Sequence, residues 1–83
     1  KTVRMPVDEV HLYVDPRHET DKVSAALARV LAKYHGGKPV ILHLISSRQE
    51  IHMVPKFYVD FSEEAEEALK GLLGNAAVEG RKN

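Results

Sequence analysis

The chain of 83 residues contains no cysteine. It therefore offers no disulfide, no thiolate ligand for a metal and no thiol nucleophile. It also lacks an excess of positive charge, because twelve lysines and arginines balance twelve aspartates and glutamates. Domains dedicated to nucleic-acid binding usually carry such an excess. Nucleic acid is therefore not expected as the main ligand.

Long apolar runs are missing as well. None approaches the roughly 18 residues that a transmembrane helix needs, and no signal-peptide pattern is present. From these absences we predict a cytoplasmic protein that does not contact a membrane. The segment opens on Lys1 rather than methionine, so we expect it to come from a longer protein.

What the chain does contain is sufficient for one small domain. The hydrophobic share of 43% and the charged share of 29% are ordinary for a soluble globular protein. A chain of this length buries about 60–65% of the surface that its unfolded form exposes. The core is therefore expected to be small.

Hydrophobic periodicity predicts the first strand and the first helix. Apolar and polar residues alternate along Val10–Val14, as in a half-buried strand. Apolar residues then recur at spacings of three and four through Val23–Tyr34, as on one face of a helix. Thr20 or Asp21 can cap the start of this helix.

The run from Tyr34 to Leu44 is expected to end that helix and to begin a buried strand. Gly36 and Gly37 can adopt the left-handed backbone that closes a helix, and Pro39 suits the first residue of a strand. Val40–Ile45 is apolar apart from one histidine, which is typical of a central strand. A strand, a helix and a second strand predict a right-handed parallel crossover, with adjacency left open.

The second half of the chain begins with a predicted hairpin. Polar residues separate Val40–Ile45 from the alternating segment Glu50–Val54, and the expected register sets His43 opposite His52. Phe57–Val59 is read as a short fourth strand.

A second helix follows that strand. It is expected to start at a cap formed by Asp60 or Ser62 and to end at Gly74 and Asn75, after apolar residues at helical spacing.

These elements predict an α+β fold in the order β-α-β-β-β-α. Two amphipathic helices need an apolar surface to cover, and one mixed sheet of three to four strands supplies it. We expect a two-layer sandwich with both helices on one face. Residues 1–9 would be a lead-in from a preceding domain, 10–78 a single α/β domain, and 79–83 a flexible tail.

Three histidines are predicted to share one sheet face. His11, His43 and His52 all lie opposite the apolar positions of their strands, and Glu50 is nearby. Three imidazoles and a carboxylate could bind zinc. Side chains that stand parallel on a flat face seldom converge, however, so a polar sheet face is the favoured interpretation and no metal is assigned.

No catalytic residue and no cofactor are predicted. The serines lie at turns or helix caps, and none is in the context of a nucleophile elbow. The acidic residues of the second helix suit the positive end of its dipole and a solvated face.

The outward sheet face is the better candidate for function. Tyr13, Ile41, Ile45 and Val54 would accompany the three histidines there if the helices cover only the other side. A mixed apolar and polar patch of this kind suits a protein interface or contact with a neighbouring domain. A small nucleic-acid-binding domain that uses Arg48, Lys56 and the basic tail is an alternative hypothesis.

From Val10 onward the sequence resembles the C-terminal domain of the bacterial DNA polymerase III alpha subunit. The resemblance covers about seventy residues in the family's order. It is carried by the helix Val23–Tyr34, the run His35-Gly36-Gly37-Lys38-Pro39-Val40-Ile41-Leu42, the pattern Tyr58-Val59 with Ser62, and the segment Leu69-Lys70-Gly71-Leu72-Leu73-Gly74-Asn75-Ala76-Ala77-Val78.

The resemblance implies a non-catalytic part of a replicative DNA polymerase, whose active site lies elsewhere in the parent chain. Its family role is to attach the alpha subunit to the tau subunit of the clamp loader. Contacts with adjacent polymerase domains are implied as well. If tau binds near the C-terminus, Leu72, Leu73 and Val78 are the expected contacts. Members of the family often have an apolar, acidic tail after the final valine. This chain differs there, with the sequence Glu79-Gly80-Arg81-Lys82-Asn83.

Overall fold

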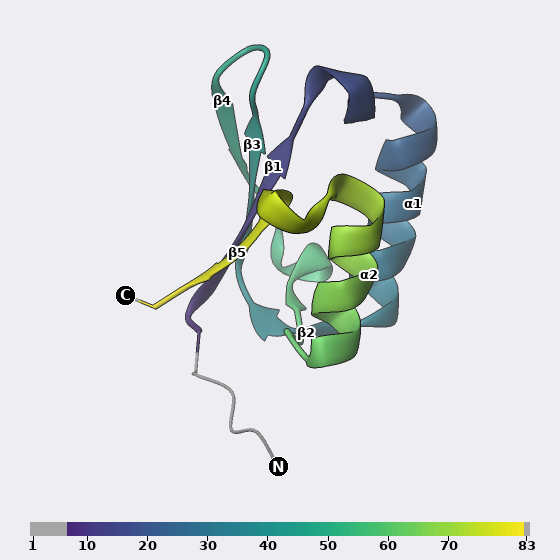
Figure 1. Ribbon diagram of the computed structural model, residues 1–83. Coiled ribbons are helices and arrows are strands. Elements are labelled where there is room, and N and C mark those ends of the chain that lie inside the picture. The colour runs from purple at the N-terminus through teal and green to yellow at the C-terminus, as the bar shows by residue number, and fades with distance from the viewer. Residues whose placement is uncertain (1–6, 83) are drawn as a thin grey trace.

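Two helices pack on one face of a four-stranded mixed sheet, in the computed structural model that describes residues 7–82 (Figure 1). This is the predicted α+β two-layer arrangement. Among the described residues, no helix is both long and apolar enough to span a membrane. The helices and strands are, in chain order, β1 (Glu9–Val14), α1 (Asp21–Lys33), β2 (His35–Lys38), β3 (Val40–Leu44), β4 (Gln49–His52), α2 (Glu63–Leu73) and β5 (Val78–Arg81).

The sheet has the strand order β4-β3-β1-β5. Strands β1 and β3 are adjacent and parallel, with Val10 opposite Val40. This confirms the predicted parallel pairing and answers the question of adjacency. Strand β4 runs antiparallel to β3, and β5 runs antiparallel to β1.

Both helices begin at the predicted caps. The hydroxyl Oγ1 of Thr20 accepts a hydrogen bond from the backbone N–H of Val23 at 3.2 Å. In the same way Oγ of Ser62 accepts from the N–H of Ala65 at 3.2 Å. Each cap satisfies one of the N–H groups that a helix start leaves without a partner.

The core lies between the sheet and the helices. It is built from the apolar side chains that alternate along the strands and recur along the helices, as the periodicity predicts. The buried members are Val10, Leu12, Val14, Leu27, Leu31, Val40, Val59, Ala65, Leu69, Leu73 and Val78.

The prediction that Gly36 and Gly37 close α1 with a left-handed backbone is wrong. Within residues 7–82, positive φ angles occur only at Arg48 and Gly74. Gly36 instead lies in β2, where a Cβ atom would approach the backbone N of Asp60 to 2.5 Å. A close passage of two backbones therefore accounts for this glycine.

The hairpin forms as predicted, but its register differs by two residues. A four-residue turn, 45–48, joins the strands, and His43 lies opposite Glu50 while His52 lies opposite Ile41. A shift of two residues leaves every side chain on the same face of the sheet, so alternation alone cannot distinguish the two registers.

The fourth strand of the sheet is also not the expected one. Pro55–Phe57 forms a turn of 3₁₀ helix, and Val59 makes only isolated bridges to His35 and Lys38. The edge position is filled by β5, in the segment predicted to be a flexible tail after Val78. Val78 opposite Leu12 supplies the buried contact that holds this strand.

Candidate functional site

One face of the sheet is turned away from α1 and α2 (Figure 1). The strand register places most of the polar side chains of the strands on this face. We call it the outer face. Its members, placed there by the strand register, are Glu9, His11 and Tyr13 of β1, Ile41 and His43 of β3, Glu50 and His52 of β4, and Glu79 and Arg81 of β5.

Two of the predicted histidines are in direct contact at the centre of the outer face. Nδ1 of His11 and Nε2 of His43 are 2.7 Å apart, so one imidazole donates the hydrogen bond and the other accepts it. The second nitrogen of His11, Nε2, lies 3.0 Å from Oε1 of Glu9. His11 is only 5% exposed, and both of its ring nitrogens have a polar partner.

Tyr13 extends this cluster toward β5. Its ring stacks on His43 with 4.6 Å between centroids, and its hydroxyl donates to Oε1 of Glu79 at 3.1 Å. Arg81 donates to the Tyr13 oxygen at 2.6 Å and to the Glu79 carboxylate at 2.8 Å. The ring faces of Tyr13 and His43 are thus turned toward each other.

Burial and neighbouring charge set the protonation of this cluster. Burial, reinforced by the proximity of His11, holds the pKa of His43 below its ordinary value. Burial and then the hydrogen bond to Glu79 raise the pKa of Tyr13. Hydrogen bonds from Arg81 and Tyr13 lower the pKa of the Glu79 carboxyl. At neutral pH, the His43 ring is therefore neutral.

The third predicted histidine lies apart from the other two. His52 is exposed on β4, where its Nε2 lies 2.9 Å from Oε1 of Glu50. Nδ1 of His43 and Oε2 of Glu50 are 4.0 Å apart. The polar groups thus form a chain across three strands, and within residues 7–82 no three histidine or acidic side chains are grouped as ligands of a metal ion.

Several of the predicted contact residues are not at the surface. Ile41 is 2% exposed, Leu73 is 2% exposed and Val78 is 9% exposed. Leu72 is half-buried against the core. Of the residues predicted as a C-terminal contact, Leu73 and Val78 are buried, because helical and strand periodicity direct them into the core. Of the outer-face candidates, Tyr13, His43 and His52 remain accessible.

The exposed large apolar side chains of the described chain gather on the β3–β4 hairpin and just beyond it. Ile45 in the turn is 49% exposed, Ile51 in β4 is 39% exposed, and Val54 after β4 is 57% exposed. Ile45 and Val54 were predicted to be accessible. The exposure of Ile51 was not predicted, because the alternation of β4 places this side chain on the face that the helices cover. Strand β4 is at the edge of the sheet, beyond the cover of the helices.

The basic residues proposed for nucleic-acid contact lie in different elements of the fold. Arg48 lies in the hairpin turn and Lys56 in the 3₁₀ turn, where its Nζ is 5.7 Å from the centroid of the Phe57 ring. Arg81 of the tail is paired with Glu79.

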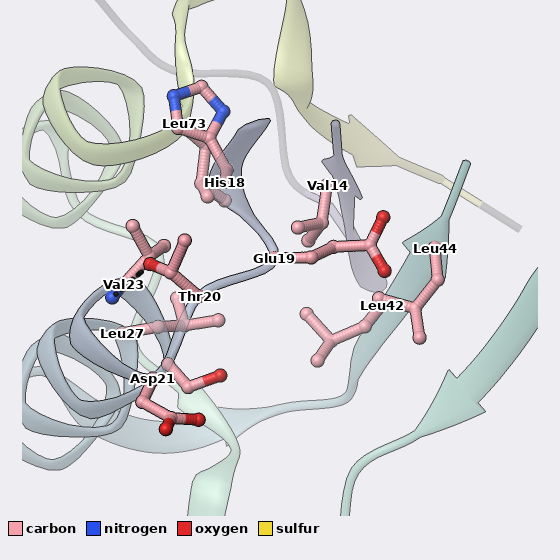
Figure 2. A pocket seen from close by; sticks show the side chains of 11 residues that line it. Val14, His18, Glu19, Thr20, Asp21, Val23, Leu27, Leu42, Leu44 and Leu73 are labelled. Carbon is pink, nitrogen blue, oxygen red and sulfur yellow. Dashed lines mark hydrogen bonds between the residues drawn. The ribbon is translucent and has the colours of Figure 1, made fainter. Parts of the chain in front are cut away.

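A hollow of about 210 Å³ opens where β1 and β3 end and α1 begins (Figure 2). Its floor is apolar, and Leu27, Leu42 and Leu44 contribute to it. Figure 2 shows the Glu19 side chain extending toward Leu44 of β3. Oγ of Ser46 donates to Oε2 of that carboxylate at 2.6 Å. No local sequence pattern predicts this hollow, because its walls come from distant parts of the chain.

His18 contributes an unusual polar atom to the wall of the hollow. Among the described residues its Nδ1 is buried without a hydrogen-bond partner, and Oδ2 of Asp15 is 3.9 Å away. The side chain as a whole is still 22% exposed. The lining of the hollow therefore combines polar side chains from residues 18–24 with apolar side chains from β1 and β3.

Comparison with protein-family models, with curated proteins and with solved structures found no match to this chain.

Proposed function

We propose that this chain is a non-catalytic interaction domain of a bacterial replicative DNA polymerase alpha subunit, and that it docks the polymerase to the tau subunit of the clamp loader. The order of the sequence motifs from Val10 to Val78 carries the proposal. Those motifs occupy positions on which the fold depends, as the contacts between them illustrate.

The Gly-Gly run and the aromatic-x-Val pattern hold each other in place. The N–H of Gly36 donates to the carbonyl of Tyr58 at 3.1 Å, and the N–H of Asp60 donates to the carbonyl of Tyr34 at 2.6 Å. Val59 between them is fully buried. Two segments that are separate motifs in the sequence therefore form one structural unit, which connects α1 to the start of α2.

The leucine-rich motif plays a corresponding part at the other end of α2. Leu69 and Leu73 are buried, and Gly74 follows with a φ of 106°, a conformation that other residues rarely adopt. Val78 then begins β5. These residues are explained by folding, so the partner must be bound by other side chains.

The accessible part of the outer face and the adjacent hairpin are the proposed docking surface. Tyr13, His43 and His52 provide polar and aromatic contacts, while Ile45 and Val54 provide apolar area. Interfaces of moderate size combine such groups in a partly apolar centre with a polar rim.

Calorimetric titration of purified tau into the chain tests this proposal. We expect a saturable heat signal with a dissociation constant in the micromolar range or tighter, which corresponds to roughly −8 kcal/mol. Absence of heat and of NMR shift changes at tens of micromolar would contradict the proposal. A parallel titration with single-stranded DNA tests the alternative, which requires binding that weakens steeply with salt.

A further inference from the structure

Strand β4 forms an open edge of the sheet. It is the last strand in the order β4-β3-β1-β5, and none of residues 7–82 pairs with its far side. The N–H of Met53 donates to the carbonyl of Val40 at 3.0 Å. In an antiparallel pair, hydrogen-bonded residues alternate. Ile51 therefore also bonds to β3, whereas Glu50 and His52 direct their backbone N–H and C=O groups outward.

Apolar side chains accompany this open backbone. Ile51 of β4 is 39% exposed, and Ile45 and Val54 flank the strand with exposed fractions of 49% and 57%. Proteins commonly protect a free edge, because unpaired backbone groups beside apolar surface recruit another strand. Here both features coincide on the same strand, which is the combination that strand addition by a peptide uses.

The two faces of β4 define the chemistry of such a strand. On the helix side, Ile51 favours an apolar neighbour. On the outer face, the Glu50 side chain is 54% exposed and its carboxylate favours a basic neighbour, since opposite charges across paired strands attract. Resting on the docking function proposed above, we infer that β4 accepts an extended segment of the partner protein as a fifth strand, with an apolar residue beside Ile51 and a basic residue beside Glu50.

A second copy of this chain is the competing occupant. Antiparallel self-pairing about Ile51 would place Glu50 of one copy opposite His52 of the other, which is also favourable. Contact between the sheets would, however, be limited to one strand of four residues from each copy. Stable interfaces bury roughly 1,200–2,000 Å². A partner segment that continues over Ile45 and Val54 gains more area, so it is the better occupant.

A matched pair of variants tests the inference in the full chain with purified tau. His52→Pro removes an outward N–H that the fold does not use, and proline is tolerated at such edge positions. His52→Thr changes the side chain but keeps the N–H. Both variants lose the imidazole contact, so the N–H is measured by the difference between them. We expect the affinity for tau to be about tenfold or more lower for His52→Pro than for His52→Thr. Glu50→Gln should weaken binding roughly two- to fivefold.

Hydrogen exchange of the unsubstituted chain gives an independent measurement. Saturating tau should slow exchange at the N–H groups of Glu50 and His52, even if His52→Pro fails to fold. Unchanged exchange there, with tau bound, overturns the edge-strand inference and leaves the docking function standing. Failure of the unsubstituted chain to bind tau overturns both. Sedimentation tests the competing occupant. If the chain forms a concentration-dependent dimer that His52→Pro abolishes, β4 binds a second copy and the inference of a partner strand is overturned.

Discussion

Gly36 shows how a single residue can be fixed by contact rather than by turn geometry. A Cβ at this position would lie 2.5 Å from the backbone N of Asp60 and 2.7 Å from its Cα, so the two segments would have to separate. We predict that Gly36→Ala lowers the free energy of unfolding by about 1–3 kcal/mol in urea titration.

Gly37→Ala is the matched control, because a Cβ there meets no atom within 4 Å and its φ is not positive. It should leave the stability unchanged or raise it by about 0.4–1 kcal/mol through the unfolded state. If both variants lose the same free energy of unfolding, the close approach of Gly36 to the Asp60 backbone is not the reason for glycine at this position.

Gly71 and Gly74 lie on the same segment and should respond in opposite directions. Gly74 has φ of 106° and ψ of 153°, a region that is essentially restricted to glycine, so Gly74→Ala should cost about 1–3 kcal/mol. Gly71 is in the interior of α2 with no atom within 4 Å of an added Cβ. Gly71→Ala should therefore raise the free energy of unfolding by about 1 kcal/mol. Thermal and urea unfolding of the two single variants check the signs, and a loss at Gly71 would contradict this account.

His43 should make the stability depend on pH. Its surroundings are His11 and Tyr13 of β1, Glu50 of β4, and Glu79 and Arg81 of β5. Burial, followed by His11, lowers its pKa in the folded state below the ordinary 6.5. The unfolded chain therefore takes up the proton at a higher pH than the folded chain does.

The sign of the effect follows from this order. The contribution of His43 to stability is complete above about pH 6.5 and is lost as the pH falls from there toward the lowered folded value. Urea midpoints between pH 5 and 8 should decline in this window, and His43→Gln should flatten the decline. An NMR titration that places the folded His43 pKa at or above 6.5 would contradict the prediction.

At the scale of elements, the sequence predicted those that bury a regular apolar stripe. Both helices, their caps at Thr20 and Ser62, and the strands β1 and β3 all follow from periodicity and capping chemistry. Strand β5 escaped prediction because Val78 is its only buried residue. Phe57 and Val59 are half-buried and buried, respectively, without forming a strand of the sheet. Their apolar character therefore led to the wrong prediction of a strand at Phe57–Val59.

The cap of α2 allows a test at the same scale. Loss of the Ser62 hydroxyl leaves the N–H of Ala65 without its side-chain acceptor at 3.2 Å. Ser62→Ala should therefore lower the free energy of unfolding by about 1 kcal/mol, while Ser62→Asp should preserve most of it. Ser47→Ala, in the exposed hairpin turn, is the control and should change the stability by less than about 0.5 kcal/mol. If both alanine variants behave alike in urea titration, the cap contributes nothing.

At the scale of the whole molecule, the candidate site depends on relations that no local pattern encodes. Alternation correctly placed His11, His43 and His52 on one face, but the contact of the first two and the separation of the third depend on strand order and register. Leu73 and Val78 entered the predicted site through family resemblance alone, and the structure buries both in the core.

The position of β5 beside β1 makes the C-terminal segment part of the fold. A chain that stops after Ala77 would lose the pairing from Val78 to Arg81 and expose Leu12, which is fully buried opposite Val78. Losing one buried valine and several strand hydrogen bonds should cost about 3 kcal/mol or more. A domain of this size has only about 4–12 kcal/mol in total. We therefore expect a large fall in the melting temperature, whereas a chain that stops after Arg81 should melt like the full chain. Equal melting of both truncated chains in calorimetry would show that β5 is dispensable, and the segment would then be the flexible tail that its polar composition predicts.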